Sequence, residues 1–413
     1  MPDSIGPTGA VLRQRKFARF LGARLLATLA AQIQSVAVGW QIYAITRDPL
    51  DLGLIGLSQF LPFVVLILPA GQIADHYDRP KVLSCCYFAE TLCAVLLLWF
   101  TIQGVTVAWP VFAAMVVLGC ARAFSMPSGQ ALLPNLVTHA DFSRAVALNS
   151  STFQIATVAG PALGGLLYLA GPRVVYMSVM GLALGAVLLM VGVRPIGGQA
   201  RFLKEAPSWH SLLSGLRFVR TKPLILGAIS LDLFAVLFGG ATALLPIFAR
   251  DVLHVGPAGL GLLRTAPGIG AALCALVLAF TPIAHRVGAW MFGGVAVFGA
   301  ATIVFAMSSN FVVTLLALSL LGAADMVSVY IRHLLVQLQT PDQIRGRVSA
   351  VSAVFIGASN ELGEFESGVT AKWLGALRAA VLGGILTLVV TGLWIRLFPT
   401  LWRMDQFGEP VRS

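Results

Sequence analysis

The sequence has few charged residues and few cysteines for its length. Only 11% of its 413 residues are charged, whereas 58% are hydrophobic. The mean hydropathy of +0.87 lies far above that of ordinary soluble domains, which excludes a water-soluble fold. All five cysteines lie in apolar segments, without a partner in a polar loop and without metal-ligand spacing. We interpret them as packing residues rather than as disulfides or a metal site.

The sequence also lacks an arrangement typical of enzymes. No glycine-rich phosphate loop leads into lysine and then serine or threonine, and the six histidines show no metal-ligand pairing. We therefore predict that the chain is not an enzyme, binds no metal or cofactor, and draws energy from an ion gradient rather than from ATP.

Long hydrophobic runs extend along the whole chain instead. A spanning helix needs about 20 apolar residues, so a dozen such runs predict an all-α integral membrane protein with the lipid bilayer as its solvent. The first run is too long for a signal-peptide core and has no cleavage pattern. The predicted spans are 20–44, 52–74, 82–103, 108–130, 146–170, 174–193, 224–248, 259–282, 288–307, 311–334, 348–370 and 376–398.

The basic residues gather on one side of these spans. Nineteen of the 28 lie in the loops that share a side with both termini. The opposite loops hold only Arg47, Arg173, Arg250, Lys372 and Arg378. The positive-inside rule then places both termini in the cytoplasm of a multi-pass protein of the bacterial inner membrane. Lipid insertion explains the net charge of +11, so we expect no nucleic-acid partner.

A polar stretch divides the chain into two halves. Residues 194–222 predict a cytoplasmic linker between six-helix bundles at 1–193 and 223–413. Within the linker, 208–220 has hydrophobic residues at helical spacing, which fits either a helix on the membrane surface or a solvated linker. A faint repeat supports the halves, since Asp141 and Arg144 follow the fourth span as Asp342 and Arg345 follow the tenth.

The loop after the second span carries a recognisable motif. Gly71, Asp75 and Arg79 match the loop signature of the major facilitator superfamily, and Lys81 stands in for its basic pair, whereas His76, Asp78 and Pro80 depart from it. The resemblance implies that the aspartate steadies one state of the transport cycle. A topological anchor without a gating role is the alternative.

Two further segments resemble motifs of exporters in that superfamily. In span five, Gly160, Pro161, Gly164 and Gly165 resemble the antiporter motif, in which glycines four apart let helices approach and proline permits a bend. Ordinary small-residue packing would give the same pattern. In span four, Arg122 ends a partial match to the motif of proton-linked drug exporters, and it can equally pair with a carboxylate or face a polar cavity.

Nearly the whole chain resembles the enterobactin exporter branch of the superfamily, for example at Asn360-Glu-Leu-Gly-Glu-Phe-Glu-Ser367. The resemblance implies the major facilitator fold of two six-helix bundles. It also implies outward transport of siderophores or other small amphipathic molecules.

Carboxylates inside the spans are the strongest functional signal apart from the family. A charge near the bilayer centre costs about 2.5–3.5 kcal/mol on insertion scales. Glu361 and Glu364 share one face of a helix, and Asp232 and Asp325 lie in other spans. We predict that these residues bind the coupling proton, the alternative being a buried structural network. Arg332, two turns from Asp325, is placed to bridge to other charges.

Uncharged polar residues in the spans suggest a path for the solute. Gln34, Gln154 and Asn360, together with Arg122, are candidates for lining a cavity, although each can also join helices by hydrogen bonds. The predicted function is therefore export of a small amphipathic molecule by proton antiport. A membrane scaffold or sensor with a transporter fold, or an uptake transporter, is the alternative. A monomer is compatible with the sequence, which leaves the oligomeric state open.

Overall fold

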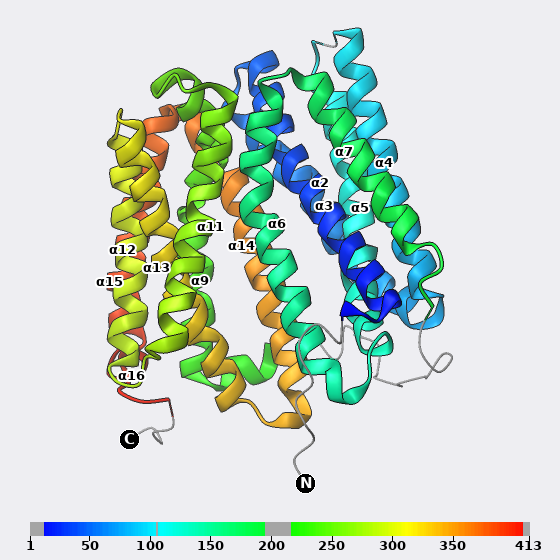
Figure 1. Cartoon of the computed structure of the whole chain (residues 1–413). Coiled ribbons are helices and arrows are strands. Elements are labelled where there is room, and N and C mark those ends of the chain that lie inside the picture. The colour runs from blue at the N-terminus through cyan, green and yellow to red at the C-terminus, as the bar shows by residue number, and fades with distance from the viewer. Residues whose placement is uncertain (1–11, 105, 195–215, 408–413) are drawn as a thin grey trace. The chain divides into compact units, whose positions relative to one another are not determined.

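The computed structural model describes residues 12–104, 106–194 and 216–407, and every regular element within these ranges is a helix (Figure 1). Twelve long helices in the described residues coincide with the twelve predicted spans, so the predicted fold class is confirmed at this level. They are α2 (Arg15–Thr46), α3 (Pro49–His76), α4 (Arg79–Gln103), α5 (Trp109–Leu132), α6 (Phe142–Tyr168), α7 (Pro172–Met190), α9 (Pro223–Phe238), α11 (Gly256–Phe280), α12 (Val287–Met307), α13 (Phe311–Gln339), α14 (Asp342–Leu374) and α15 (Ala376–Leu397).

Ten of the helical segments are long and apolar enough to cross a membrane, but α6 and α14 are not among them. Both helices are long enough. Their hydropathy is reduced by polar residues, which include Asn149 and Gln154 in α6 and Asn360, Glu361 and Glu364 in α14. Polar groups on a spanning helix are costly in lipid, so these two helices are the ones that need water or protein beside them.

The chain forms two compact units. Unit 1 contains Met1–Gln41 and Ser58–Pro207, and unit 2 contains Ile42–Leu57 and Ser208–Ser413. The segment 42–57, which joins α2 to α3, therefore groups with the C-terminal part of the sequence. Most of the predicted linker lies outside the described residues. Of its proposed surface helix at 208–220, residues 216–220 are described and helical.

The seventh span is continuous in hydropathy but irregular in structure. After α9 the chain forms η3 (Gly240–Leu244), a single α-helical turn α10 (Leu245–Ile247) and a π-helical turn η4 (Phe248–Val252). Pro246 has no backbone N–H to donate, so one helical hydrogen bond is missing here, which favours an irregular turn. The π-turn contains Asp251, and such turns are frequent at functional sites.

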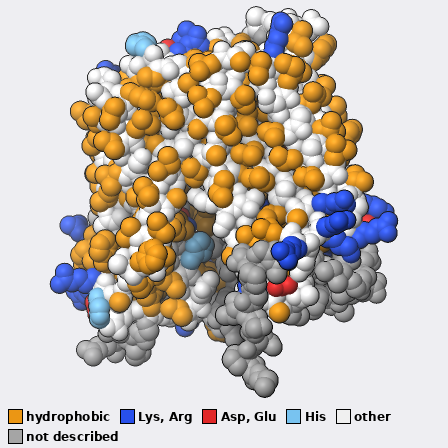
Figure 2. All heavy atoms as spheres, in the orientation of Figure 1, with side chains coloured by type: hydrophobic (Ala, Val, Ile, Leu, Met, Phe, Trp, Pro, Cys, Tyr) orange, Lys and Arg blue, Asp and Glu red, His pale blue; other side chains and the backbone are white. Residues whose placement is uncertain are grey.

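Small residues set the helix spacing inside each unit, because lipid tails are as apolar as the core and contribute little drive for helices to associate. Between α11 and α13 of unit 2, a Cβ on Gly270 would lie 1.7 Å from the carbonyl oxygen of Ser319, and a Cβ on Gly322 would lie 2.0 Å from that of Pro267. Only glycine permits this approach. The outer faces of the helices carry hydrophobic side chains, with Lys and Arg gathered near helix ends (Figure 2).

Candidate functional site

A buried ion pair joins two helices of unit 2. Arg332 of α13 pairs with the carboxylate of Asp232 in α9, and their side chains are only 2% and 5% exposed. Because α9 and α13 pack directly against each other, the pair bridges the interior of the unit. Arg332 thus pairs with a charge on another helix, as its two-turn separation from Asp325 had suggested.

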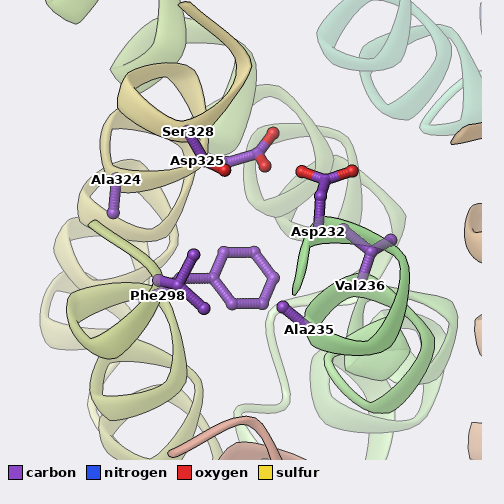
Figure 3. A pocket seen from close by; sticks show the side chains of 8 residues that line it. Asp232, Ala235, Val236, Phe298, Ala324, Asp325 and Ser328 are labelled. Carbon is purple, nitrogen blue, oxygen red and sulfur yellow. The ribbon is translucent and has the colours of Figure 1, made fainter. Parts of the chain in front are cut away.

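Asp325 faces the same interior from α13. Figure 3 shows its carboxylate pointing toward the carboxylate of Asp232, above the ring of Phe298 from α12. The three side chains line a small pocket, and Ser328, which also lines it, lies one turn further along α13. Two of the four predicted coupling carboxylates therefore share one site.

Glu361 and Glu364 lie at a different place in unit 2. A Cβ on Gly56 would lie 3.1 Å from Oε2 of Glu361 and 3.0 Å from Oε2 of Glu364. The two oxygens are therefore no more than about 6 Å apart, within the range where one carboxylate affects protonation of another. Arg264 of α11 adds a positive charge that acts on Glu364.

The segment 42–57 is held to unit 2 by side chains at its start. Asp251 accepts a hydrogen bond from the hydroxyl of Tyr43 and forms an ion pair with Arg47, with 2.9 Å between Nη1 and Oδ1. Arg47 adopts a φ of 54°, a left-handed conformation that costs a non-glycine residue about 1–2 kcal/mol. The backbone turns sharply here and directs the guanidinium toward Asp251.

A second ion pair lies beside the first. Lys372 Nζ donates to Asp48 Oδ2 over 2.6 Å, and the backbone N–H of Leu50 donates to Oδ1 of the same carboxylate over 3.0 Å. Partial burial tends to raise the pKa of Asp48, but the hydrogen bonds and the charge of Lys372 outweigh it, so the pKa lies below its ordinary value. We call segment 42–57 with Asp251 and Lys372 the clasp.

Backbone contact completes the clasp. A Cβ on Gly368 of α14 would lie 3.0 Å from both Cα of Gly53 and the carbonyl oxygen of Pro49, and a Cβ on Gly53 would lie 3.0 Å from Cα of Phe365. The segment thus packs on α14 with its backbone, at glycines on both sides. Larger side chains there would hold the two apart.

Unit 1 contains its own charged residues. Glu90 of α4 is half-buried, and Arg122 of α5, exposed on its helix, is the charge that acts on it. Of the other cavity candidates, Gln34 in α2 is buried, whereas Gln154 in α6 and, in unit 2, Asn360 in α14 are exposed. None of these four cavity candidates lines the pocket between α9, α12 and α13.

The glycines of α6 lie against α2. A Cβ on Gly160 would lie 2.4 Å from Cβ of Gln32, and a Cβ on Gly164 would lie 3.0 Å from the carbonyl oxygen of Ile33. Pro161 and Gly165 are also buried in this helix. The motif therefore stands at a close helix contact inside unit 1.

The loop signature lies between α3 and α4. Gly71 is buried in α3, Arg79 donates to the carbonyl oxygen of Ala131 over 3.0 Å, and exposed Lys81 lies 3.7 Å from Asp78. The side chain of Asp75 lies outside the described residues. The described contact of Arg79 ties the start of α4 to the end of α5.

Neither the clasp nor Ser328 was predicted from the sequence. A signal for the clasp was present, because Arg47 and Lys372 are two of the few basic residues in their set of loops, and Asp48 and Asp251 lie in the same set. Pairing across about 200 or 320 residues of sequence could not be assigned without the fold. Ser328 carries no pattern that distinguishes it from other serines in helices.

Twelve long helices in the described residues, with an ion pair buried between two of them, define a polytopic membrane protein. The family model described as transmembrane secretion effector matches residues 7–407. The chain belongs to this family of the major facilitator superfamily, and the resemblance to its enterobactin exporter branch is confirmed.

Individual relatives cover nearly the whole chain. The enterobactin exporter EntS of Citrobacter koseri is 27% identical over 398 residues, which span 94% of this chain and 92% of that protein. The uncharacterized MFS-type transporter YfiS of Bacillus subtilis is 24% identical, spanning 91% and 92%. A mutant of the nucleoside transporter NupG matches in structure with a TM-score of 0.78 at 13% identity, covering 93% of this chain and 100% of that one. This last likeness shows the fold alone, which is the major facilitator fold.

Proposed function

We propose that this protein exports a small amphipathic molecule, siderophore-like or drug-like, across the bacterial inner membrane in exchange for protons. The similarity to EntS, which is named as an enterobactin exporter, supports the direction and the substrate class. The glycine-rich motif of α6 supports the same direction.

The observation that carries the proton coupling is the convergence of Glu361 and Glu364 beside Gly56. Two carboxylates this close repel one another when both are ionised, so one of them takes up a proton more readily. Arg264 offsets one of the two negative charges. A single proton then neutralises the remaining charge, and an acidic compartment supplies it.

The clasp supports a change of conformation during transport. Its ion pairs are exposed to water and therefore weak enough to break and reform. On the predicted topology Arg47 and Lys372 lie on the periplasmic side. We propose that the clasp is closed when the substrate path is shut on that side, and that it opens to release the substrate.

The polar faces of α6 and α14 support a hydrated path for the solute. Gln154 and Asn360 are exposed on helices that are long enough to span the membrane. An exposed amide in lipid lacks hydrogen-bond partners, whereas in a water-filled cavity it binds water or a polar part of the substrate.

The test uses purified protein in proteoliposomes with enterobactin as the probe and an imposed pH gradient. The double variant Glu361→Gln/Glu364→Gln should lose uphill, gradient-driven transport while retaining downhill movement, since glutamine preserves size and hydrogen bonding. The matched control is Glu366→Gln, a neighbouring carboxylate that accepts a hydrogen bond from Thr370 over 2.7 Å.

Full gradient-driven transport by the double variant would refute the assignment of the proton site. Loss of downhill movement as well would indicate structural damage. Comparison of extracellular metabolites from cells with and without the gene identifies the exported compound independently of the probe.

A further inference from the structure

The pocket between α9, α12 and α13 is too small for an amphipathic solute. The space open to the centre of a water-sized sphere is about 10 Å³, which is roughly what one water molecule needs and far too little for an organic ligand. Its polar lining consists of Asp232, Asp325 and Ser328, and all three side chains present oxygen atoms. Oxygen ligands in a small space suit a hard cation or a proton.

The charges around the pocket leave one negative charge unbalanced. Arg332 compensates Asp232, and the described residues include no ion pair to Asp325. Helix α9 carries no ionisable residue besides Asp232, and α12 carries none. On α13 the other ionisable residues are Tyr330, Arg332 and His333, and α15 carries Arg378 and Arg396 near its ends. Helix α14, which packs on α9, adds the negative charges of Glu361 and Glu364, and Arg264 of α11 acts on Glu364. Within the pocket, one negative charge therefore has no positive partner among the described residues.

Ser328 gives a second, independent indication of a ligand. Its residue is 2% exposed and lines the pocket, and its Oγ has no hydrogen-bond partner among the described residues. Buried hydroxyl groups in proteins are almost always satisfied. An occupant of the pocket would satisfy this one, and Ser328 follows Asp325 by three residues on the same helix face.

We propose that this pocket binds one monovalent cation, Na⁺ or a proton, through the carboxylate of Asp325 and the hydroxyl of Ser328. Asp232 is the third oxygen group and exchanges between Arg332 and the cation. A divalent ion would overcompensate the one unbalanced negative charge and leave the pocket with one positive charge. The inference rests on the proposed function only for its link to transport, because binding itself requires no export.

The test measures thermal unfolding of the full chain in detergent, with NaCl exchanged for choline chloride at constant ionic strength. If Na⁺ is the occupant, it raises Tm saturably in the native protein, and the shift is lost in Asp325→Asn and in Ser328→Ala. The matched control is Ser359→Ala, which removes an equally buried serine of α14 whose Oγ donates to the carbonyl oxygen of Ile356 over 3.0 Å. This control should keep the full shift.

If a proton is the occupant, Na⁺ has no effect on Tm, and a titration of the native protein between about pH 5 and pH 9 releases one proton that Asp325→Asn does not release. An ordinary aspartate, with a pKa of about 3.9, releases almost none in this range. The proposal is overturned when Na⁺ leaves Tm unchanged and the two proteins release the same number of protons between these pH values. It is also overturned when Ser328→Ala and Asp325→Asn, both folded by circular dichroism, keep the Na⁺ shift. Cation binding without export would refute the proposed function alone, and export without cation binding here would refute this inference alone.

Discussion

The two sets of ion pairs in unit 2 differ chiefly in their access to water. The side chains of Arg332 and Asp232 are 2% and 5% exposed, whereas those of Arg47 and Asp251 in the clasp are 53% and 37% exposed. An exposed pair is screened by water and salt and contributes about 0–1 kcal/mol. A buried pair that loses one partner costs about 3–5 kcal/mol, because the other charge stays in a medium of low dielectric constant. The buried pair is therefore suited to a contact that persists, or that changes only when a cation binds beside it. The clasp is suited to a contact that opens repeatedly.

The largest expected effect follows from breaking the buried pair. Arg332→Met leaves Asp232 buried and uncompensated, so we expect a loss of about 3–5 kcal/mol in the free energy of unfolding, measured by denaturant titration in detergent. The double variant Asp232→Asn/Arg332→Met should recover most of this loss. Arg47→Met makes the same change in the exposed pair and should cost less than about 1 kcal/mol. Equal losses of unfolding free energy in Arg332→Met and Arg47→Met would contradict the expectation that burial of the pair sets the cost.

A smaller effect is expected where the clasp packs by its backbone. Gly368→Leu places a side chain where Gly53 and Pro49 approach, and overpacking of this kind costs about 1–3 kcal/mol. If that cost falls only on the closed clasp, the equilibrium constant for closure falls by about 5-fold to 150-fold. The measurement is the yield of a short dimaleimide crosslink between Asp48→Cys and Lys372→Cys, with exposed Cys85 changed to serine.

Gly392→Leu is the control for this packing effect, because a Cβ at Gly392 meets no atom within 4 Å. It should leave the crosslinking yield unchanged. An unchanged yield in Gly368→Leu would show that the segment does not need its close backbone contact.

Arg47 offers a way to weaken the clasp without weakening the fold. Arg47→Gly removes the ion pair with Asp251, worth less than about 1 kcal/mol, but also relieves the left-handed conformation at φ 54°. The free energy of unfolding should therefore stay within about 1 kcal/mol of the native value while the crosslinking yield falls. Arg47→Ala, which keeps the strained backbone, should be the less stable of the two. A yield equal to that of the native sequence would show that Arg47 does not hold the clasp.

The smallest effect concerns pH and salt. The folded-state pKa of Asp48 lies below its ordinary value, so its contribution is fully present above the unfolded value of about 3.9 and is lost as the pH falls through the folded value. Spin labels are attached to Arg47→Cys and Asp251→Cys at neutral pH. The fraction of protein with a short distance between the labels should be constant from about pH 7 to pH 5 and decrease below about pH 4. Raising the salt concentration to about 1 M should lower this fraction at neutral pH. A decrease centred near neutral pH would point to another group.

The membrane fold could be read from the sequence because hydropathy alone requires it. Each apolar run must satisfy its backbone polar groups in lipid, and a helix does so within the run itself. Even α6 and α14 were predicted as spans, although Glu361, Glu364 and Gln154 lower their hydropathy. The irregular turns after α9 were not predicted, since apolar residues continue through Pro246 and hide the break.

The candidate sites were predictable only in part. The four carboxylates were found because ionisable groups in apolar runs are rare, but their division into two places depends on which helices pack together. Asp232 and Asp325 meet across one pocket, whereas Glu361 and Glu364 approach Gly56. The pairing of Arg47 with Asp251 joins residues 204 positions apart, and no local pattern specifies such a partner.

By itself, the sequence determined that the chain is helical, crosses the membrane many times and carries charges that need a function, because these properties follow from the transfer of each residue type between water and lipid. Tertiary structure alone decided that Arg332 compensates Asp232 and leaves Asp325 unbalanced, that Ser328 faces the same pocket, and that segment 42–57 packs on α14. These are matters of distance between helices. Small residues such as Gly53 and Gly368 set those distances through packing, which composition and periodicity do not record.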